Sequence, residues 1–65
     1  MISEEKRQEI ATILLNYRVK NNLSQQELGK KLKVSSHTIF DIEHQNKRVR
    51  ATTIIKILNQ IKESD

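Results

Sequence analysis

The chain has 65 residues, a formal net charge of +4, and neither cysteine nor proline. This length permits one small domain, and the lack of cysteine excludes a disulfide framework and cysteine-based metal sites. No run approaches the ~18 apolar residues that a membrane span needs, and the N-terminus carries acids rather than a basic, apolar signal sequence. We therefore expect a single cytoplasmic domain over residues 1–65 that does not contact a membrane.

The basic residues gather in the middle of the chain. Between residues 18 and 50 the sequence has eight lysines and arginines against three acids. A basic surface of this kind can face a polyanion such as DNA, although an ordinary solvated surface explains the charges equally well. The eight residues are Arg18, Lys20, Lys30, Lys31, Lys33, Lys47, Arg48 and Arg50.

The first predicted helix starts at Ser3, a good N-cap, with Glu4 and Glu5 favourably placed at its positive end. Apolar residues at i, i+3, i+4 and i+7 define its buried stripe. The helix should end at the two asparagines 21 and 22, because asparagine tolerates the left-handed conformation that often follows a helix. The predicted stripe consists of Ile10, Ile13, Leu14 and Tyr17.

Three shorter helices are predicted after it. Ser24-x-x-Glu27 has the form of a capping box and opens the second helix. A three-residue break at 33–35 leads into a third helix from about Ser36. The polar, basic segment 44–50 is expected to be a loop, and a fourth helix begins near Ala51. The residues predicted to face inward are Leu28, Leu32, Val34, Ile39, Ile42, Ile54, Ile57, Leu58 and Ile61.

The segment 25–43 has the pattern of a helix-turn-helix, predicted over about residues 24–45. Two apolar-periodic runs flank the break, and the only glycine of the chain, Gly29, lies in the first run. Closely crossing helices need a very small side chain where they meet, although glycine costs a helix roughly 1 kcal/mol relative to alanine. Ser35 and Ser36 can cap the second helix of the unit, which in such motifs can lie in the major groove of DNA.

Several residues make the chain resemble the Cro/C1-type (XRE) family of phage-repressor helix-turn-helix domains, over about residues 10–61. The resemblance implies an all-α, compact four-helix domain, without the fifth helix with which the family tends to finish. It also implies a structural clasp between Arg18 and Glu43. The motifs that carry the resemblance are Leu23-Ser24-Gln25 and Thr38-Ile39-x-x-Ile42-Glu43.

The resemblance further implies a site in which the helix over about residues 36–45 enters the major groove. Phe40 either packs at the edge of the domain or touches a thymine methyl group, and Asp41 could accept from a cytosine amino group or repel other sequences. The residues expected to read base edges are Ser35, Ser36, His37, Phe40 and Asp41. Those expected to bind the DNA backbone are Gln25, Asn46, Lys47, Arg48 and Arg50.

The chain departs from the family pattern at several positions. Lys33 stands where the family has a turn glycine, and a left-handed lysine costs of order 1 kcal/mol, which predicts a distorted turn. Gln45 and Val49 replace a glycine and a proline in the following loop, which predicts a looser loop. Phe40 stands where polar residues are more usual.

The sequence gives weaker support for a metal site or an enzyme active site. His37, Asp41 and His44 lie at i, i+4 and i+7 on one helix face and could offer three ligands to zinc. A polar reading face explains these residues better, and no fourth ligand is apparent, so we expect no metal and no cofactor. The sequence contains no nucleophile–base pairing and no phosphate loop, so we expect no enzyme.

The leading hypothesis is a sequence-specific DNA-binding transcriptional regulator, a repressor. One small domain makes few contacts, so we expect a homodimer on a palindromic operator in double-stranded DNA. Leu15 and Ile55 lie off the main stripes and could form the dimer contact or close the core. The alternative is a protein-interaction module of the same fold, antitoxin-like or binding a regulatory partner, which Phe40, Asp41 and the lost turn glycine favour.

Overall fold

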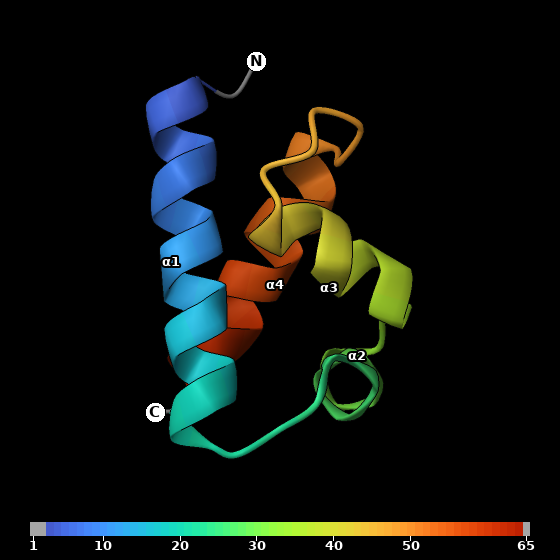
Figure 1. Cartoon of the computed structure of the whole chain (residues 1–65). Coiled ribbons are helices and arrows are strands. Elements are labelled where there is room, and N and C mark those ends of the chain that lie inside the picture. Colours follow the sequence, from blue (N-terminus) through green and yellow to red (C-terminus); the bar gives the residue numbers. More distant parts are fainter. Residues whose placement is uncertain (1–2, 65) are drawn as a thin grey trace.

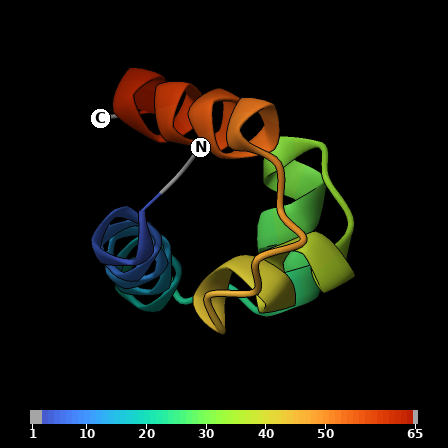
Figure 2. The same ribbon diagram turned by 90° about the horizontal axis from the view of Figure 1, so that it is seen from above.

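A computed structural model describes residues 3–64, and this part of the chain is helical without strands. The helices are α1 (Glu4–Lys20), α2 (Gln25–Leu32), α3 (Ser36–Glu43) and α4 (Ala51–Ser64). The four predicted helices are thus confirmed, while residues 1, 2 and 65 of the predicted domain lie outside the described residues. In Figure 1, α1 runs along one side of the molecule, and Figure 2 shows α1 to α4 arranged around a common centre.

Serine caps set the starts of the first three helices. The Ser3 hydroxyl accepts from the backbone N–H of Lys6 at 3.1 Å. The capping box is formed in full, because the Ser24 hydroxyl accepts from the N–H of Glu27 and the Glu27 carboxylate accepts from that of Ser24. These bonds satisfy N–H groups that the first turn of a helix leaves without a partner.

Left-handed residues follow three of the helices. After α1, Asn22 has φ 55°, as predicted for the asparagine pair. Lys33 follows α2 with φ 60° and ψ 42°, and Gln45 lies two residues beyond α3 with φ 57°. Because His44 caps α3 and Gln45 turns the chain, α3 is shorter than the predicted helix over 36–45.

The core forms where the apolar faces of all four helices meet. Most of the predicted inward positions are buried, and Leu58 and Val34 pack against this core while partly buried. Ile13 is the exception: it is 36% exposed, and the small Ala11 is buried in its place on the inner face of α1. The main buried cluster is Ile10, Leu14, Tyr17, Leu28, Leu32, Ile39, Ile42, Val49, Ile54, Ile57 and Ile61.

An open groove lies between α1 and α4, and its apolar wall is formed by Ile13, Ile55 and Leu58. Leu15 and Ile55 are both exposed, so neither closes the core. The side-chain amide of Gln60 in α4 donates to the backbone carbonyl of Leu32 at 2.9 Å and ties α4 to the last residue of α2. None of the helices within residues 3–64 is both long and apolar enough to cross a membrane.

Candidate nucleic-acid interface

The turn between α2 and α3 is built on Gly29 and Lys33. A Cβ added to Gly29 would lie 2.7 Å from the carbonyl oxygen of Val34 and 3.2 Å from the backbone nitrogen of Ser36. The close approach that requires glycine is therefore to the backbone of the turn, rather than to a crossing helix as predicted. Lys33 adopts the left-handed conformation and the N–H of Val34 donates to the Gly29 carbonyl at 2.9 Å, so the turn closes despite the lysine.

Ser35 is the residue that orients the start of α3. Its hydroxyl accepts from the backbone N–H of Thr38 at 3.1 Å and lies 2.9 Å from the Thr38 hydroxyl. Ser35 is thus the N-cap, whereas Ser36 is the first residue of the helix and is partly buried. The Ser35 side chain is exposed and engaged with its own helix.

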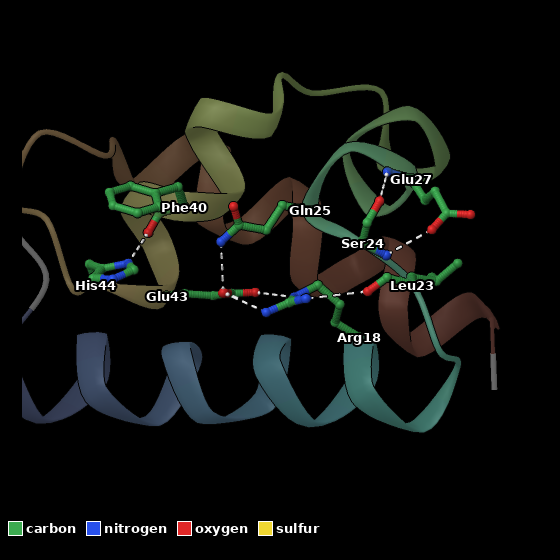
Figure 3. Close-up of polar contacts among 8 residues, drawn as sticks. All are labelled: Arg18, Leu23, Ser24, Gln25, Glu27, Phe40, Glu43 and His44. Carbon is green, nitrogen blue, oxygen red and sulfur yellow. Dashed lines mark hydrogen bonds and ion pairs between the residues drawn. The ribbon is translucent and has the colours of Figure 1, made fainter.

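A clasp joins α1, α2 and α3, and it contains the predicted pair of Arg18 and Glu43. Figure 3 shows the Arg18 guanidinium beside the Glu43 carboxylate, with Nε to Oε2 at 2.7 Å and Nη2 to Oε1 at 3.2 Å. Gln25 adds a third donor, because its Nε2 donates to Oε1 of Glu43 at 3.1 Å. Arg18 also donates to the Leu23 carbonyl at 3.3 Å. The Glu43 side chain is only 7% exposed, so it depends on these donors.

Gln25, which is predicted to bind the DNA backbone, is a member of the clasp. Its side chain lies partly buried there, at the first turn of α2.

The outer face of α3 carries a row of aromatic rings. Phe40 is 43% exposed and stacks on His44, with the ring centroids 3.9 Å apart. Nδ1 of His44 lies 2.9 Å from the carbonyl oxygen of Phe40, which holds the imidazole in this position (Figure 3). His37 is one turn earlier, highly exposed, and nearly parallel to Phe40 at 6.5 Å. Phe40 therefore does not pack into the edge of the domain.

The prediction that Asp41 shows on this outer face is wrong. Asp41 is 9% exposed, and its Oδ1 accepts from Nδ2 of Asn46 at 3.3 Å. Its Oδ2 lies 3.4 Å from Nε2 of His37. The helical rotation of 100° per residue turns Asp41 away from Phe40 and towards the following loop. Across residues 3–64 there is no cluster of three or more His, Cys, Asp or Glu side chains that could hold a metal ion.

The loop between α3 and α4 displays the predicted cations. Lys47, Arg48 and Arg50 are exposed, and Lys47 lies 3.6 Å from the exposed carboxylate of Glu4. Asn46 is partly buried, and its Oδ1 accepts from the backbone N–H of Arg48 at 2.9 Å. The side chain of Asn46 thus shapes the loop from within.

Sequence reasoning missed Arg7, which binds this loop from α1. Its guanidinium donates to the backbone carbonyls of Asn46, Lys47 and Val49. Val49 is itself buried, so the predicted looseness of the loop is not found. The signal was present in the sequence: Arg7 lies three residues before Ile10 and seven before Leu14, on the buried face of α1, where a charged residue needs polar partners.

Comparison with known proteins gives one match. A family model described as Helix-turn-helix matches residues 14–64, which include the clasp, the turn, α3 and the basic loop. Neither the curated proteins nor the solved structures contain a match. The matched residues cover most of the chain, and of the contacts that build the candidate interface only those of Arg7 and Glu4 to the loop start outside them. The chain therefore belongs to the Cro/C1-type (XRE) family of helix-turn-helix DNA-binding domains.

Proposed function

We propose that this protein is a sequence-specific transcriptional repressor that reads the major groove with α3. The observation that carries the proposal is the continuity of two exposed surfaces. The helix that exposes His37 and Phe40 runs directly into the loop that exposes Lys47 and Arg48. Side chains that can contact base edges thus adjoin cations that can bind phosphates. In DNA recognition, base contacts read the sequence and phosphate contacts position the protein.

Within this proposal, Phe40 contacts a thymine methyl group. Its ring is exposed and its position is supported by the stacked ring of His44. Apolar contact with the C5-methyl group is one way in which proteins distinguish thymine in the major groove. Ser36 and His37 lie on the first turn of the same helix and are assigned to neighbouring base edges. Asp41 is assigned to the support of His37 and Asn46, because its carboxylate faces both.

Phosphate contacts are assigned to the loop cations Lys47, Arg48 and Arg50, to Asn46, and to Gln25 at the start of α2. Ser35 lies at the N-terminal end of α3, where the partial positive charge of the helix favours an anion. Lys30 lines a shallow hollow together with Ser35 and Ser36, and adds a cation beside this end of α3. The set gives one face with several sites for phosphate oxygens.

Repression by a homodimer on a palindromic operator in the cytoplasm completes the proposal. A single module makes few base contacts, and a twofold dimer doubles them by reading two half-sites. Occupying a promoter is sufficient to block transcription, whereas activation needs a further contact with the transcription machinery.

Selection of bound sequences from a random pool of duplex DNA tests the proposal. We expect enrichment of a palindromic sequence, and replacement of thymine by deoxyuridine at one position per half-site should weaken binding. The Phe40→Ala variant should be insensitive to that replacement, because the methyl group then has no partner. Uniform recovery of random sequences would refute sequence-specific reading.

The salt dependence of binding tests the loop. Arg48→Ala should lower the slope of log affinity against log salt by about one unit. Lys20→Ala removes the same charge at the end of α1, outside the proposed face, and serves as the matched control. Absence of any retardation of genomic fragments at low salt by the folded protein would favour the protein-interaction module instead.

A further inference from the structure

We infer that Arg7 is a positioning residue for DNA binding, which orders the basic loop without contacting DNA. The inference rests on the proposed function, because it assigns Arg7 to the phosphate-binding part of that same surface. Arg7 reaches from α1 across to the segment between α3 and α4, about forty residues further along the chain. Glu4 of α1 contacts the same loop through its ion pair with Lys47 at 3.6 Å.

The contacts of Arg7 are all made to backbone carbonyls. Nη1 donates to Asn46 O at 3.1 Å and to Val49 O at 3.4 Å, and Nη2 donates to Lys47 O at 3.3 Å. A guanidinium has five N–H donors in a rigid plane and can bridge several acceptors at once, which an ammonium group cannot do in the same geometry. The bonds do not depend on loop side chains, so the side chains of Lys47 and Arg48 stay exposed, with the Lys47 ammonium group 3.6 Å from the exposed carboxylate of Glu4.

The opposite side of the loop is held by Asp41 in α3. The backbone N–H of Asn46 donates to the Asp41 carbonyl at 2.8 Å, and the Asn46 side chain donates to the Asp41 carboxylate at 3.3 Å. The same side chain accepts from the N–H of Arg48 at 2.9 Å. The side chain of Asn46 therefore holds the backbone of Arg48, a residue with a proposed phosphate contact. Arg7 in turn binds the backbone carbonyl of Asn46.

This arrangement explains how the loop is ordered without the residues that usually stiffen loops. The loop has no proline, whose ring would fix φ and stiffen the backbone. Order must come from tertiary contacts, and an ordered loop binds better because less conformational entropy is lost when DNA arrives. Arg7 lies before residues 14–64, which the family model matches, whereas its three acceptors lie within them.

A measurement without DNA tests whether Arg7 orders the loop. In Arg7→Met the apolar stem remains and the donors are lost, while Lys6→Met is the matched control, because Lys6 is an exposed neighbour paired only with Glu9 at 3.7 Å. We expect hydrogen exchange at the amides of Asn46, Arg48 and Val49 to accelerate about tenfold in Arg7→Met and to stay unchanged in the control. Unchanged exchange, or a uniform acceleration across the whole chain, would overturn the inference.

Binding to the selected operator tests the positioning role. We expect Arg7→Met to weaken binding about 5- to 10-fold, as the fraction of molecules with a competent loop falls, and Arg7→Lys to recover part of the loss. In a background of Lys47→Ala and Arg48→Ala, the further loss from Arg7→Met should largely disappear. A fully additive loss would identify a direct phosphate contact by Arg7 and overturn the inference.

The two measurements separate this inference from the proposed function. If the wild-type protein binds no DNA, the proposed function is refuted and the DNA-binding role of Arg7 falls with it. Amide exchange then still decides whether Arg7 orders the loop. If the wild-type protein binds its operator and Arg7→Met binds equally well, the proposed function stands and the inference alone is refuted.

Discussion

Replacement of Gly29 by alanine tests the geometry of the helix-turn-helix turn. The new methyl group would lie 2.7 Å from Val34 O, 3.2 Å from Ser36 N and 3.3 Å from Ser35 C. All three are backbone atoms of the turn that leads into α3, so no side-chain rotation can relieve the contact. The turn must move, and with it the hydrogen bond from the Val34 N–H to the Gly29 carbonyl at 2.9 Å.

Two opposing terms decide the sign of the effect on stability. Alanine gains about 1 kcal/mol over glycine in a helix interior. Overpacking costs about 1–3 kcal/mol, and weakening one backbone hydrogen bond costs about 1 kcal/mol. The net expectation for Gly29→Ala is a loss of about 1–3 kcal/mol in the free energy of unfolding. For a domain of this size this lowers the melting temperature by about 4–24 °C.

Urea and thermal unfolding followed by circular dichroism measure this loss. Lys30→Ala is the matched control: it lies next to Gly29 on the exposed face of α2, and its stability should change by less than about 0.5 kcal/mol. Gly29→Ala at or above the stability of the wild-type protein would refute the reasoning, since it would show that the turn can shift at no cost. Reduced affinity for the operator should accompany the loss, because α3 begins at this turn.

Three further substitutions test other parts of the fold. Lys33→Gly should stabilise the protein by about 0.5–1 kcal/mol in urea unfolding, because glycine adopts φ 60° without steric cost; equal stability of Lys33→Gly and Lys33→Ala would contradict this. Arg18→Met should destabilise the protein by about 2–3 kcal/mol, because it leaves the Glu43 carboxylate without its main partner. Adding Glu43→Met should restore part of the lost stability. An equal or greater loss in the double variant would oppose this explanation. Hydrogen bonds from the backbone N–H and side chain of Ser24 lower the pKa of Glu27. The ionised Glu27 carboxylate therefore contributes to stability at pH values above its ordinary pKa of 4.5, and this contribution is lost as the pH falls through the lowered pKa. The urea midpoint of Glu27→Gln should therefore fall less than that of the wild-type protein between about pH 5 and pH 3, and parallel curves would argue against this contribution.

Local signals in the sequence were sufficient to predict the helices. Ser3, Ser24 and Ser35 act within a few residues of themselves, so their capping roles follow from spacing alone. The left-handed conformation of Lys33 was inferred from the family resemblance instead, because the family has a turn glycine at this position. Burial at the edge of a helix stripe was less predictable: Ile13 and Ala11 both flank the inner face of α1, and only Ala11 is buried in the folded domain.

Contacts between distant segments limited prediction of the site. The pairing of Arg18 with Glu43 could be inferred only from the family resemblance, and the share of Gln25 in it was missed. Asp41 was misassigned because its i, i+4 relation to His37 indicates a common face but does not show that the Asn46 side chain covers it. The role of Arg7 depends on acceptors about forty residues away, which no local pattern reveals.

The clasp around Glu43 has a consequence for folding cooperativity. Its three donors come from α1 and α2, whereas the carboxylate itself closes α3, so the group is satisfied only when all three helices are assembled. A partly folded chain that buries Glu43 without Arg18 carries an unpaired charge, and such intermediates are disfavoured. We therefore expect α1 and the helix-turn-helix to fold in one transition, so that residues 24–45 cannot be excised as an autonomous unit.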